Sequence, residues 1–553
     1  MFDATHSRWG RPFDLYTSSY NLTAAKTRKP ITPPAEAEAV KSISKVVQLG
    51  GAAQQPDQDK AEAVTIQVLE SILEMSLCPR TFHHLAVPPL ISGCVKLMNT
   101  MQVDGRTSPF RYEYGYLCFK IITIAIGVSI LQRTENLDMT VANMESDVDT
   151  ELMLILSGHV SRVLKYEIEA NNGTQACGWV LGWARVQNRP RLQLGPLILR
   201  ADIRSILSIL WDDRELFLKT FMITHSPGLS GVIFILWRYL YSDSLFHDTP
   251  PSHLLAAPLC EILWRYLLVA TTDQIAPLVY INNDLQLTDK AEIWNESPKY
   301  VNLDDLRIII QAYIGRMAPI DPRSHGPLEI GAIAVLLNFV TKVMQPGVEI
   351  FVPSLFGLTL DRIWDALDSL NAGGQETVGH IGAILSLFGR LVEPLNHTYY
   401  ANRVAVLELV KTLAERDLLD MIARTMLLLE PYSVEPSPAY DKNMEFLENA
   451  TALVLYLESV VPKHLLESQF VYYLFNWIKV DQHFFALERL FSQGISPYAR
   501  HFQACRRVWY QISESLAIES RIKKLRFSCF YPRTGAIVAW TAKLSEDYYR
   551  IGL

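Results

Sequence analysis

Helical periodicity is the feature of this sequence that most restricts its fold. Between residues 61 and 77, apolar side chains recur at spacings of four, four and three residues, and a second apolar row runs beside the first. The first row consists of Val64, Val68, Ile72 and Met75, and the second of Leu69, Leu73 and Leu77. The opposite, polar face consists of Gln67, Glu70 and Glu74. Two adjacent rows predict an amphipathic helix whose buried face is wide enough to contact two neighbouring helices.

The same pattern recurs along the chain, and strand patterns are nearly absent. At 302–317 and at 441–460, apolar residues again line one face of a predicted helix. Asn302 is a candidate N-cap residue, and Asp305 stands where a variant of the capping box needs it. Few segments alternate with a period of two residues, and no Asn-Gly turn joins two β-branched runs. The sequence therefore predicts an all-α fold.

Two kinds of repeated sequence motif indicate how these helices are arranged. Proline followed by a large apolar residue recurs at positions where it would open a helix, because proline suits the first helical turn. These motifs start at Pro89, Pro227, Pro258, Pro277 and Pro353, and the hexapeptide Ile-Leu-Trp-Arg-Tyr-Leu occurs at 235–240 and 262–267. Helix pairs punctuated in this way predict an armadillo- or HEAT-like stack, an α-solenoid. The alternative is two or three packed helical bundles.

Composition along the chain divides it into three predicted parts. The chain has 553 residues, more than one compact core usually holds. Residues 1–59 are predicted to form a flexible arm and linker with a short helix at 35–49, residues 60–525 the helical repeat-like domain, and residues 526–553 a C-terminal tail. Long polar loops are predicted at 170–195 and 282–299, and the second marks a possible break within the helical domain.

Charge and cysteine usage exclude several classes of protein. The net charge of −7 comes without a concentrated basic block, so we expect no binding of nucleic acid. The longest apolar runs, 121–131 and 330–337, fall short of the roughly 20 residues that a membrane span needs. Seven widely spaced cysteines and the lack of an apolar leader predict an intracellular protein, cytoplasmic or nuclear.

No sequence motif predicts a reaction. The phosphate-binding, nucleophile-elbow and zinc-protease motifs are all absent. Gly373, Gly374, Gly379 and Gly382 cluster, but their spacing fits no phosphate cradle and predicts close helix packing. We therefore predict no catalytic residue, no cofactor site and no metal site.

Weaker constellations have both a functional and a structural interpretation. Two carboxylates stand beside an arginine in Trp211-Asp212-Asp213-Arg214. This arrangement would suit general acid–base catalysis, or it could simply form a surface ion pair. His501 and Cys505 are spaced to face one metal ion, yet two ligands do not complete a zinc site. The pairs His83-His84 and His225-Ser226 are neighbours in sequence and are more readily explained as a helix surface and a helix cap.

The C-terminal segment resembles a known zinc-binding module. Arg526-Phe527-Ser528-Cys529-Phe530-Tyr531-Pro532-Arg533-Thr534 is similar to the opening of the MYND-type finger that ends some long helical fungal proteins, and Phe110–Tyr116 is similar in style to their helical body. The resemblance implies a role in protein interaction. Only Cys529 matches a zinc ligand, and no cysteine or histidine follows it. Cys529 is therefore a vestigial ligand position, and the finger is absent or truncated.

These observations favour a non-catalytic scaffold that binds a protein or peptide partner through the surface of a helical stack. One alternative is an enzyme whose site assembles from distant helices, with Trp211–Arg214 and the scattered histidines as its pieces. Another is peripheral attachment to a membrane through the basic residues Lys26–Lys29 or an exposed apolar helix.

Overall fold

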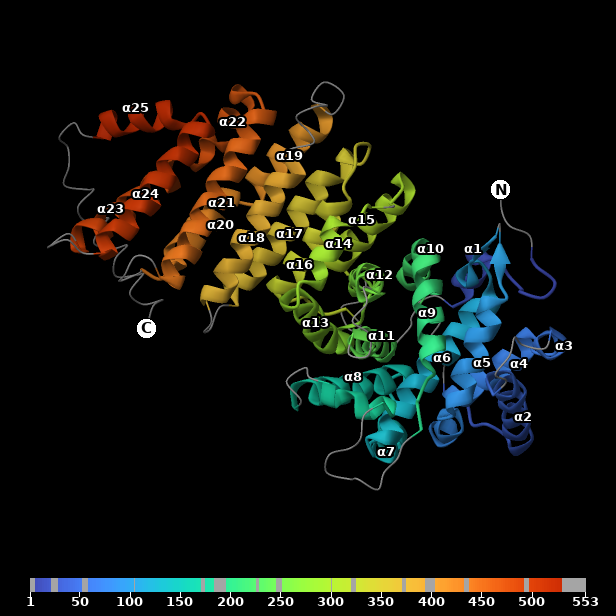
Figure 1. The fold of residues 1–553 in the computed structure, drawn as a ribbon. Coiled ribbons are helices and arrows are strands. Elements are labelled where there is room, and N and C mark those ends of the chain that lie inside the picture. Colours follow the sequence, from blue (N-terminus) through green and yellow to red (C-terminus); the bar gives the residue numbers. More distant parts are fainter. Residues whose placement is uncertain are drawn as a thin grey trace. The chain divides into compact units, whose positions relative to one another are not determined.

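The computed structural model confirms the all-α fold. It describes residues 5–20, 28–51, 58–103, 105–170, 175–183, 195–224, 228–244, 251–299, 301–319, 325–369, 374–392, 403–431, 437–491 and 497–529. Within these ranges it contains 25 α-helices, short 3₁₀ helices and a single two-stranded ribbon. The chain forms two compact units, unit 1 (Met1–Leu328) and unit 2 (Glu329–Leu553). Figure 1 labels the helices along the chain.

Unit 1 contains the first fifteen α-helices. They are α1 (Phe13–Ser19), α2 (Pro33–Gly50), α3 (Gln58–Glu62), α4 (Ile66–Glu74), α5 (Pro88–Asn99), α6 (Glu113–Arg133), α7 (Leu137–Ser146), α8 (Leu152–Ala170), α9 (Arg200–Asp212), α10 (Arg214–Ile223), α11 (Leu229–Ser244), α12 (Pro251–Leu267), α13 (Thr272–Leu287), α14 (Lys290–Glu296) and α15 (Leu303–Met317). The 3₁₀ helices are η1 (Met75–Leu77), η2 (Pro79–Leu85), η3 (Pro109–Arg111) and η4 (Gln175–Leu181). Strands β1 (Gln102–Val103) and β2 (Arg106–Thr107) pair antiparallel, with Gln102 opposite Thr107.

Helix α6 occupies the centre of unit 1. It contacts α4, α5, α7, α8 and α11, and most of its side chains are buried. The apolar run 121–131 lies inside this helix, which is longer than the run and has 21 residues. By length and composition α6 is the one helix among the described residues that could cross a membrane, and 94% of its most apolar window is buried inside the protein.

The helix predicted at 35–49 is confirmed as α2, but it is packed into unit 1 rather than carried on a flexible arm. Helix α2 packs on α4 and α5 and buries apolar side chains along one face. A Cβ atom on Gly50 would lie 2.0 Å from the carbonyl oxygen of Pro89, and one on Gly93 would lie 2.2 Å from that of Val46. The missing side chains let the α2 and α5 backbones approach closely. Because glycine adds nothing to an apolar pattern, periodicity underestimates this contact.

The predicted polar loop at 282–299 is wrong, because α13 and α14 occupy most of it. Its polar residues accept hydrogen bonds from buried tryptophans: Trp264 Nε1 donates to Asn282 Oδ1 at 2.9 Å, and Trp237 Nε1 donates to Asp284 Oδ2 at 2.8 Å. The two tryptophans occupy the same place in the two copies of the repeated hexapeptide. The chain divides instead at Leu328–Glu329. At the other predicted loop, residues 175–181 form η4.

The repeated proline motifs lie at two different kinds of position. Pro89 lies in the first turn of α5 and Pro353 in the first turn of α17 (Val352–Asp368), as predicted. Pro258 and Pro277 instead lie inside α12 and α13, where they interrupt one backbone hydrogen bond each. Pro227 lies outside the described residues. Proline alone therefore does not mark the helix starts of this chain.

Unit 2 contains the remaining α-helices, which include α17. The others are α16 (Ile330–Val343), α18 (Gly374–Val392), α19 (Arg403–Glu415), α20 (Leu418–Leu428), α21 (Pro438–Val460), α22 (Lys463–Phe470), α23 (Leu474–Phe491), α24 (Pro497–Ser515) and α25 (Glu519–Cys529). Two 3₁₀ helices, η5 (Glu349–Phe351) and η7 (Val471–Tyr473), precede α17 and α23. Helix α25 extends through Cys529, so it includes the first residues of the predicted tail.

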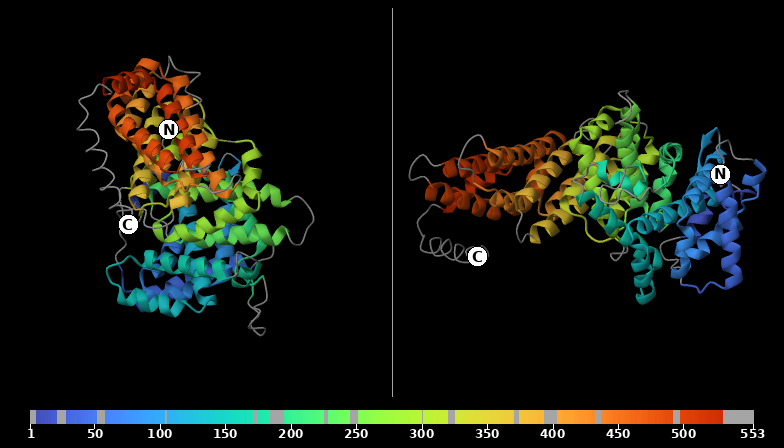
Figure 2. Two further views of the ribbon diagram at one scale, coloured as in Figure 1. Left: turned by 90° about the vertical axis from the view of Figure 1, so that its left-hand side faces the viewer. Right: turned by 60° about the horizontal axis from the view of Figure 1, so that its bottom comes forward.

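Contacts in unit 2 arrange its helices in two rows. Helices α16, α18, α21 and α24 contact one another in sequence, while α17, α19 and α22 form a second series. They can be followed in Figure 1 and from two further directions in Figure 2. Where α18 meets α21, a Cβ on Gly382 would lie 3.4 Å from Cα of Phe446. That distance is an ordinary van der Waals contact, and a Cβ on Gly379 would meet nothing within 4 Å, so these two glycines do not show the close helix packing that the sequence predicts for the cluster.

Candidate functional site

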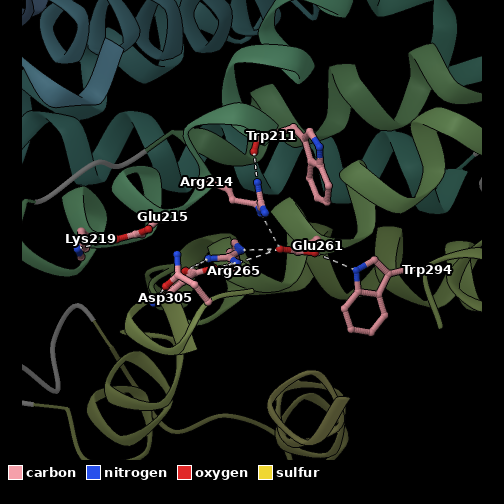
Figure 3. A network of polar contacts seen from close by, with 9 residues as sticks. Trp211, Arg214, Glu215, Lys219, Glu261, Arg265, Trp294 and Asp305 are labelled. Carbon is pink, nitrogen blue, oxygen red and sulfur yellow. Dashed lines mark hydrogen bonds and ion pairs between the residues drawn. The ribbon is translucent and has the colours of Figure 1, made fainter. Parts of the chain in front are cut away.

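A cluster of buried charge lies in unit 1, where four helices meet (Figure 3). Glu261 and Arg265 are one turn apart on α12, and both are buried. Arg214 begins α10, Trp294 comes from α14, and Asp305 lies in the first turn of α15. The N-cap predicted at Asn302 is confirmed, because its side chain accepts a hydrogen bond from the Asp305 amide at 2.9 Å. That cap fixes the start of α15 and so places the Asp305 carboxylate.

Arg265 lies at the centre of this cluster. Its Nη1 and Nη2 atoms donate to the two carboxylate oxygens of Asp305, both at 2.7 Å. Its Nε and Nη2 atoms donate to Glu261 Oε1 at 3.0 and 2.9 Å. Trp294 Nε1 donates to the other Glu261 oxygen at 3.1 Å, and Arg214 Nε lies 3.2 Å from Oε1. We call these five residues the Arg265 network.

The Arg265 network is electrically balanced and closed. Burial alone would lower the pKa of Arg265, but its hydrogen bonds and charge interactions with Asp305 and Glu261 raise that pKa above its ordinary value. Two arginines face two carboxylates, and each carboxylate oxygen already has a donor. A general base needs an oxygen that can reach a substrate proton. The arrangement therefore clamps α10, α12, α14 and α15 together rather than presenting a reactive group.

The predicted constellation Trp211–Arg214 separates in the structure. The guanidinium of Arg214 lies over the Trp211 ring, 4.5 Å from its centroid, and turns toward the Arg265 network. Asp212 is exposed, whereas Asp213 is buried. The two neighbouring carboxylates thus do not converge on one site.

Asp213 holds the start of η3 in place. Its Oδ1 atom accepts from Ser108 Oγ at 2.8 Å, and its Oδ2 atom accepts from the Phe110 amide at 2.9 Å. Burial raises the pKa of Asp213 to about 7, although the two hydrogen bonds act in the opposite direction. The perturbed carboxyl group is therefore explained by a structural contact between η3 and the start of α10.

The histidine and cysteine candidates do not assemble a metal site. His84 Nε2 lies 3.0 Å from Glu36, while His83 faces Asp138 at 3.7 Å, so the pair points in two directions. His501 Nε2 lies 3.8 Å from Cys505 Sγ inside unit 2. Across the described ranges, no group of three or more candidate ligands is close enough to hold a metal ion.

Four predicted positions lie wholly or partly outside the described residues. His225 and Ser226 are among them, and so is Gly373. Cys529 ends α25, but its side chain and the residues that follow it are not described. The vestigial zinc-ligand position at Cys529 therefore stays a prediction.

Sequence reasoning missed a second polar cluster in unit 1. Arg11 Nε donates to Glu113 Oε2 at 2.8 Å, its Nη2 atom pairs with Oε1, and the Tyr20 hydroxyl donates to Oε1 at 3.0 Å. Burial opposes ionisation of Glu113, but Arg11 and Tyr20 outweigh it and hold the pKa of this carboxyl below its ordinary value. The only sequence signal was the group of aromatic residues in the N-terminal region and at 110–116.

Comparison with known proteins adds no family assignment. No protein-family model matches this chain, and no curated protein matches it.

Proposed function

We propose that this chain is a non-catalytic scaffold that binds a protein partner, and that its main contact surface is an exposed aromatic face in unit 2. We define the aromatic face by Val471, Tyr472 and Phe475, at the junction of η7 and α23. All three side chains are exposed, and 67% of Phe475 is accessible to solvent. Exposed clusters of large apolar side chains are typical of interaction surfaces.

The rigidity of the aromatic face carries this proposal. The Tyr472 hydroxyl donates to the carbonyl oxygen of Ala414 at 2.5 Å and lies 3.3 Å from Asp417 Oδ1. Its neighbour Tyr473 is buried and donates to Asp420 Oδ1 at 2.9 Å. Both contacts fix η7 against the α19–α20 junction. A ring that is already held in place loses little conformational entropy when a partner binds, and tyrosine and phenylalanine contribute large contact areas.

Further observations support the same proposal. Asp213, the buried member of the carboxylate pair that the sequence offered for catalysis, is explained by its structural contact with η3, and Arg28 of the basic N-terminal cluster bonds to carbonyl oxygens at the end of α7. The two-row packing of unit 2 supports an armadillo- or HEAT-like stack within that unit, and the resemblance at the C-terminus also implies protein interaction. Five described cysteines are free thiols, which supports a reducing, intracellular location.

Affinity capture with a matched pair of variants tests this proposal. The full chain is immobilised, and proteins retained from extract of the source cells are compared for wild type, Phe475→Glu and Leu287→Glu. Leu287 lies in unit 1 and is 84% exposed, so it matches the charge and solubility change without altering the aromatic face. We expect that wild type and Leu287→Glu retain the same partner in similar amounts. Phe475→Glu should retain at least tenfold less of it. Identical retention by all three proteins would contradict the proposal.

A further inference from the structure

The N-terminal segment, residues 5–20, lies on unit 1 much as a bound peptide would. It crosses η3, the start of α6, and α10, which are about 90 to 210 residues further along the chain. We call the part of these elements that receives it the docking surface, and define it by Phe110, Tyr112, Glu113, Tyr116 and Thr220.

Because of Glu113, the docking surface requires a positively charged group in whatever segment occupies it. Only 4% of its side chain is exposed, and its two oxygens receive the guanidinium of Arg11 and the hydroxyl of Tyr20. A buried carboxylate without such partners is costly. The docking surface therefore needs a cationic donor at this point, and Arg11 of the N-terminal segment supplies it.

The backbone of the segment completes the first turn of α6. The first amides of a helix have no partner within it. Here the Glu113 amide donates to the carbonyl oxygen of Arg11 at 2.9 Å, and the Tyr114 amide donates to that of Trp9 at 3.1 Å. Main-chain bonds of this kind accept any peptide in the right conformation, so they give affinity while the side chains give specificity.

Tyr16 is the apolar anchor of the segment. It is fully buried, its ring stacks on Tyr116 with centroids 5.3 Å apart, and its hydroxyl donates to the carbonyl oxygen of Phe110 at 2.6 Å. The hydroxyl also lies 3.2 Å from Thr220 Oγ1. Phenol rather than phenyl is therefore the side chain that this position recognises.

The segment has few buried apolar groups compared with its neighbour α2. Within residues 5–20 only Pro12, Tyr16 and Thr17 are buried, whereas α2 buries six residues on one face. Segments with little buried apolar surface open at a lower free energy than the core. Another peptide with equivalent polar groups is thus able to compete for the same contacts.

We propose that the docking surface is a peptide-binding site and that residues 5–20 are its built-in, displaceable occupant. The ligand class is a partner peptide with an arginine followed five residues later by a tyrosine, matching Arg11 and Tyr16. This inference does not rest on the aromatic face of unit 2, because it concerns other elements and a different ligand chemistry.

Fluorescence anisotropy on the full chain tests the proposal. The probe is a labelled synthetic peptide of residues 5–20, titrated with wild-type chain and with the variant Arg11→Ala/Tyr16→Ala, in which the built-in segment is weakened. We expect the variant to bind the probe at least tenfold more tightly than wild type does. A probe carrying Arg11→Ala and Tyr16→Phe should bind the variant chain at least tenfold more weakly than the unaltered probe does. Adding Glu113→Gln to the variant chain should weaken its binding of the unaltered probe by a similar factor.

Three results would overturn the proposal. One is the absence of probe binding to a variant whose hydrogen exchange outside residues 5–20 is unchanged. Another is loss of exchange protection throughout unit 1 in that variant, because the segment would then be a structural part of the core. The third result is a concentration-dependent dimer that forms by exchange of this segment, since a second copy would then be the occupant.

The milder pair Arg11→Lys/Tyr16→Phe is the control for a simple folding failure. It should still tighten probe binding about threefold.

Discussion

Unit 1 buries eight charged side chains among the described residues, whereas the described part of unit 2 buries a single one, Asp481. The eight are Glu113, Asp202, Asp213, Arg238, Glu261, Arg265, Asp305 and Arg316. Unit 2 instead relies on apolar contacts, such as the stacked rings of Phe356 and Phe388, whose centroids lie 3.9 Å apart. Buried charges accept only partners in matching geometry, while apolar surfaces tolerate many. The comparison indicates that buried charge pairs contribute far more to the helix contacts of unit 1 than to those of unit 2.

The largest effect is expected from breaking the Arg265 network. Arg265→Met leaves Glu261 and Asp305 buried without their common partner, and loss of one member of a buried pair costs about 3–5 kcal/mol. Hydrogen exchange should show reduced protection in unit 1 while unit 2 keeps its own. Arg307→Met is the control, because Arg307 pairs with Asp304 on the surface and such pairs contribute about 0–1 kcal/mol. Equal effects of the two substitutions would contradict the stabilising role of buried charge in unit 1.

A pH-dependent effect is expected at Asp213. Its pKa is raised from 3.8 to about 7 on folding, so the folded chain holds the proton more tightly than the unfolded chain does. Its contribution to stability is therefore greatest below about pH 4 and declines as the pH rises to about 7. Relative to Asp213→Asn, the wild type should lose roughly 3 kcal/mol between pH 4 and pH 8 in urea unfolding. Ser108→Ala retains the carboxyl group and should retain the slope, whereas parallel curves for wild type and Asp213→Asn would rule out this titration.

A smaller effect is expected at the single buried carboxylate of unit 2. Asp481 accepts from Arg506 Nε at 3.0 Å, but Arg506 also pairs with Glu488 at 3.2 Å and is partly exposed. Asp481→Asn leaves Arg506 with its second carboxylate, so we expect a loss of about 1–2 kcal/mol in urea unfolding. A loss as large as that of Arg265→Met would show that unit 2 depends on buried charge after all.

The smallest effect is expected from converting unit 1 to the apolar design of unit 2. Replacing a complete buried ion-pair group by apolar residues of similar volume is often neutral or stabilising. The five-fold variant Arg214→Met/Glu261→Met/Arg265→Met/Trp294→Phe/Asp305→Leu, which leaves no member of the Arg265 network without its partner, should therefore have a free energy of unfolding within about 1 kcal/mol of wild type and well above that of Arg265→Met alone. If the five-fold variant is no more stable than Arg265→Met in the same urea titration, unit 1 needs the charges themselves.

Local signals in the sequence predicted the helices well where the pattern is strong. The cap at Asn302 and the helix at 35–49 were both anticipated from neighbouring residues. The predicted loop at 282–299 failed because Asn282 and Asp284 look solvated until tryptophans from other helices are placed against them. The candidate group Trp211–Arg214 contained a network member in Arg214, but its partner Glu261 lies 47 residues away and carries no local signal.

The all-α class can be predicted from the sequence alone, because helix periodicity, caps and propensity depend on residues within about four positions of one another. Which charges meet depends on the packing of helices that are far apart in the chain. Arg265 and Asp305 are 40 residues apart, and Arg11 and Glu113 are 102 apart. Many arginines and carboxylates in this chain are chemically equivalent candidates for each pairing. The choice among them follows from how the helices pack and which charges that packing removes from water.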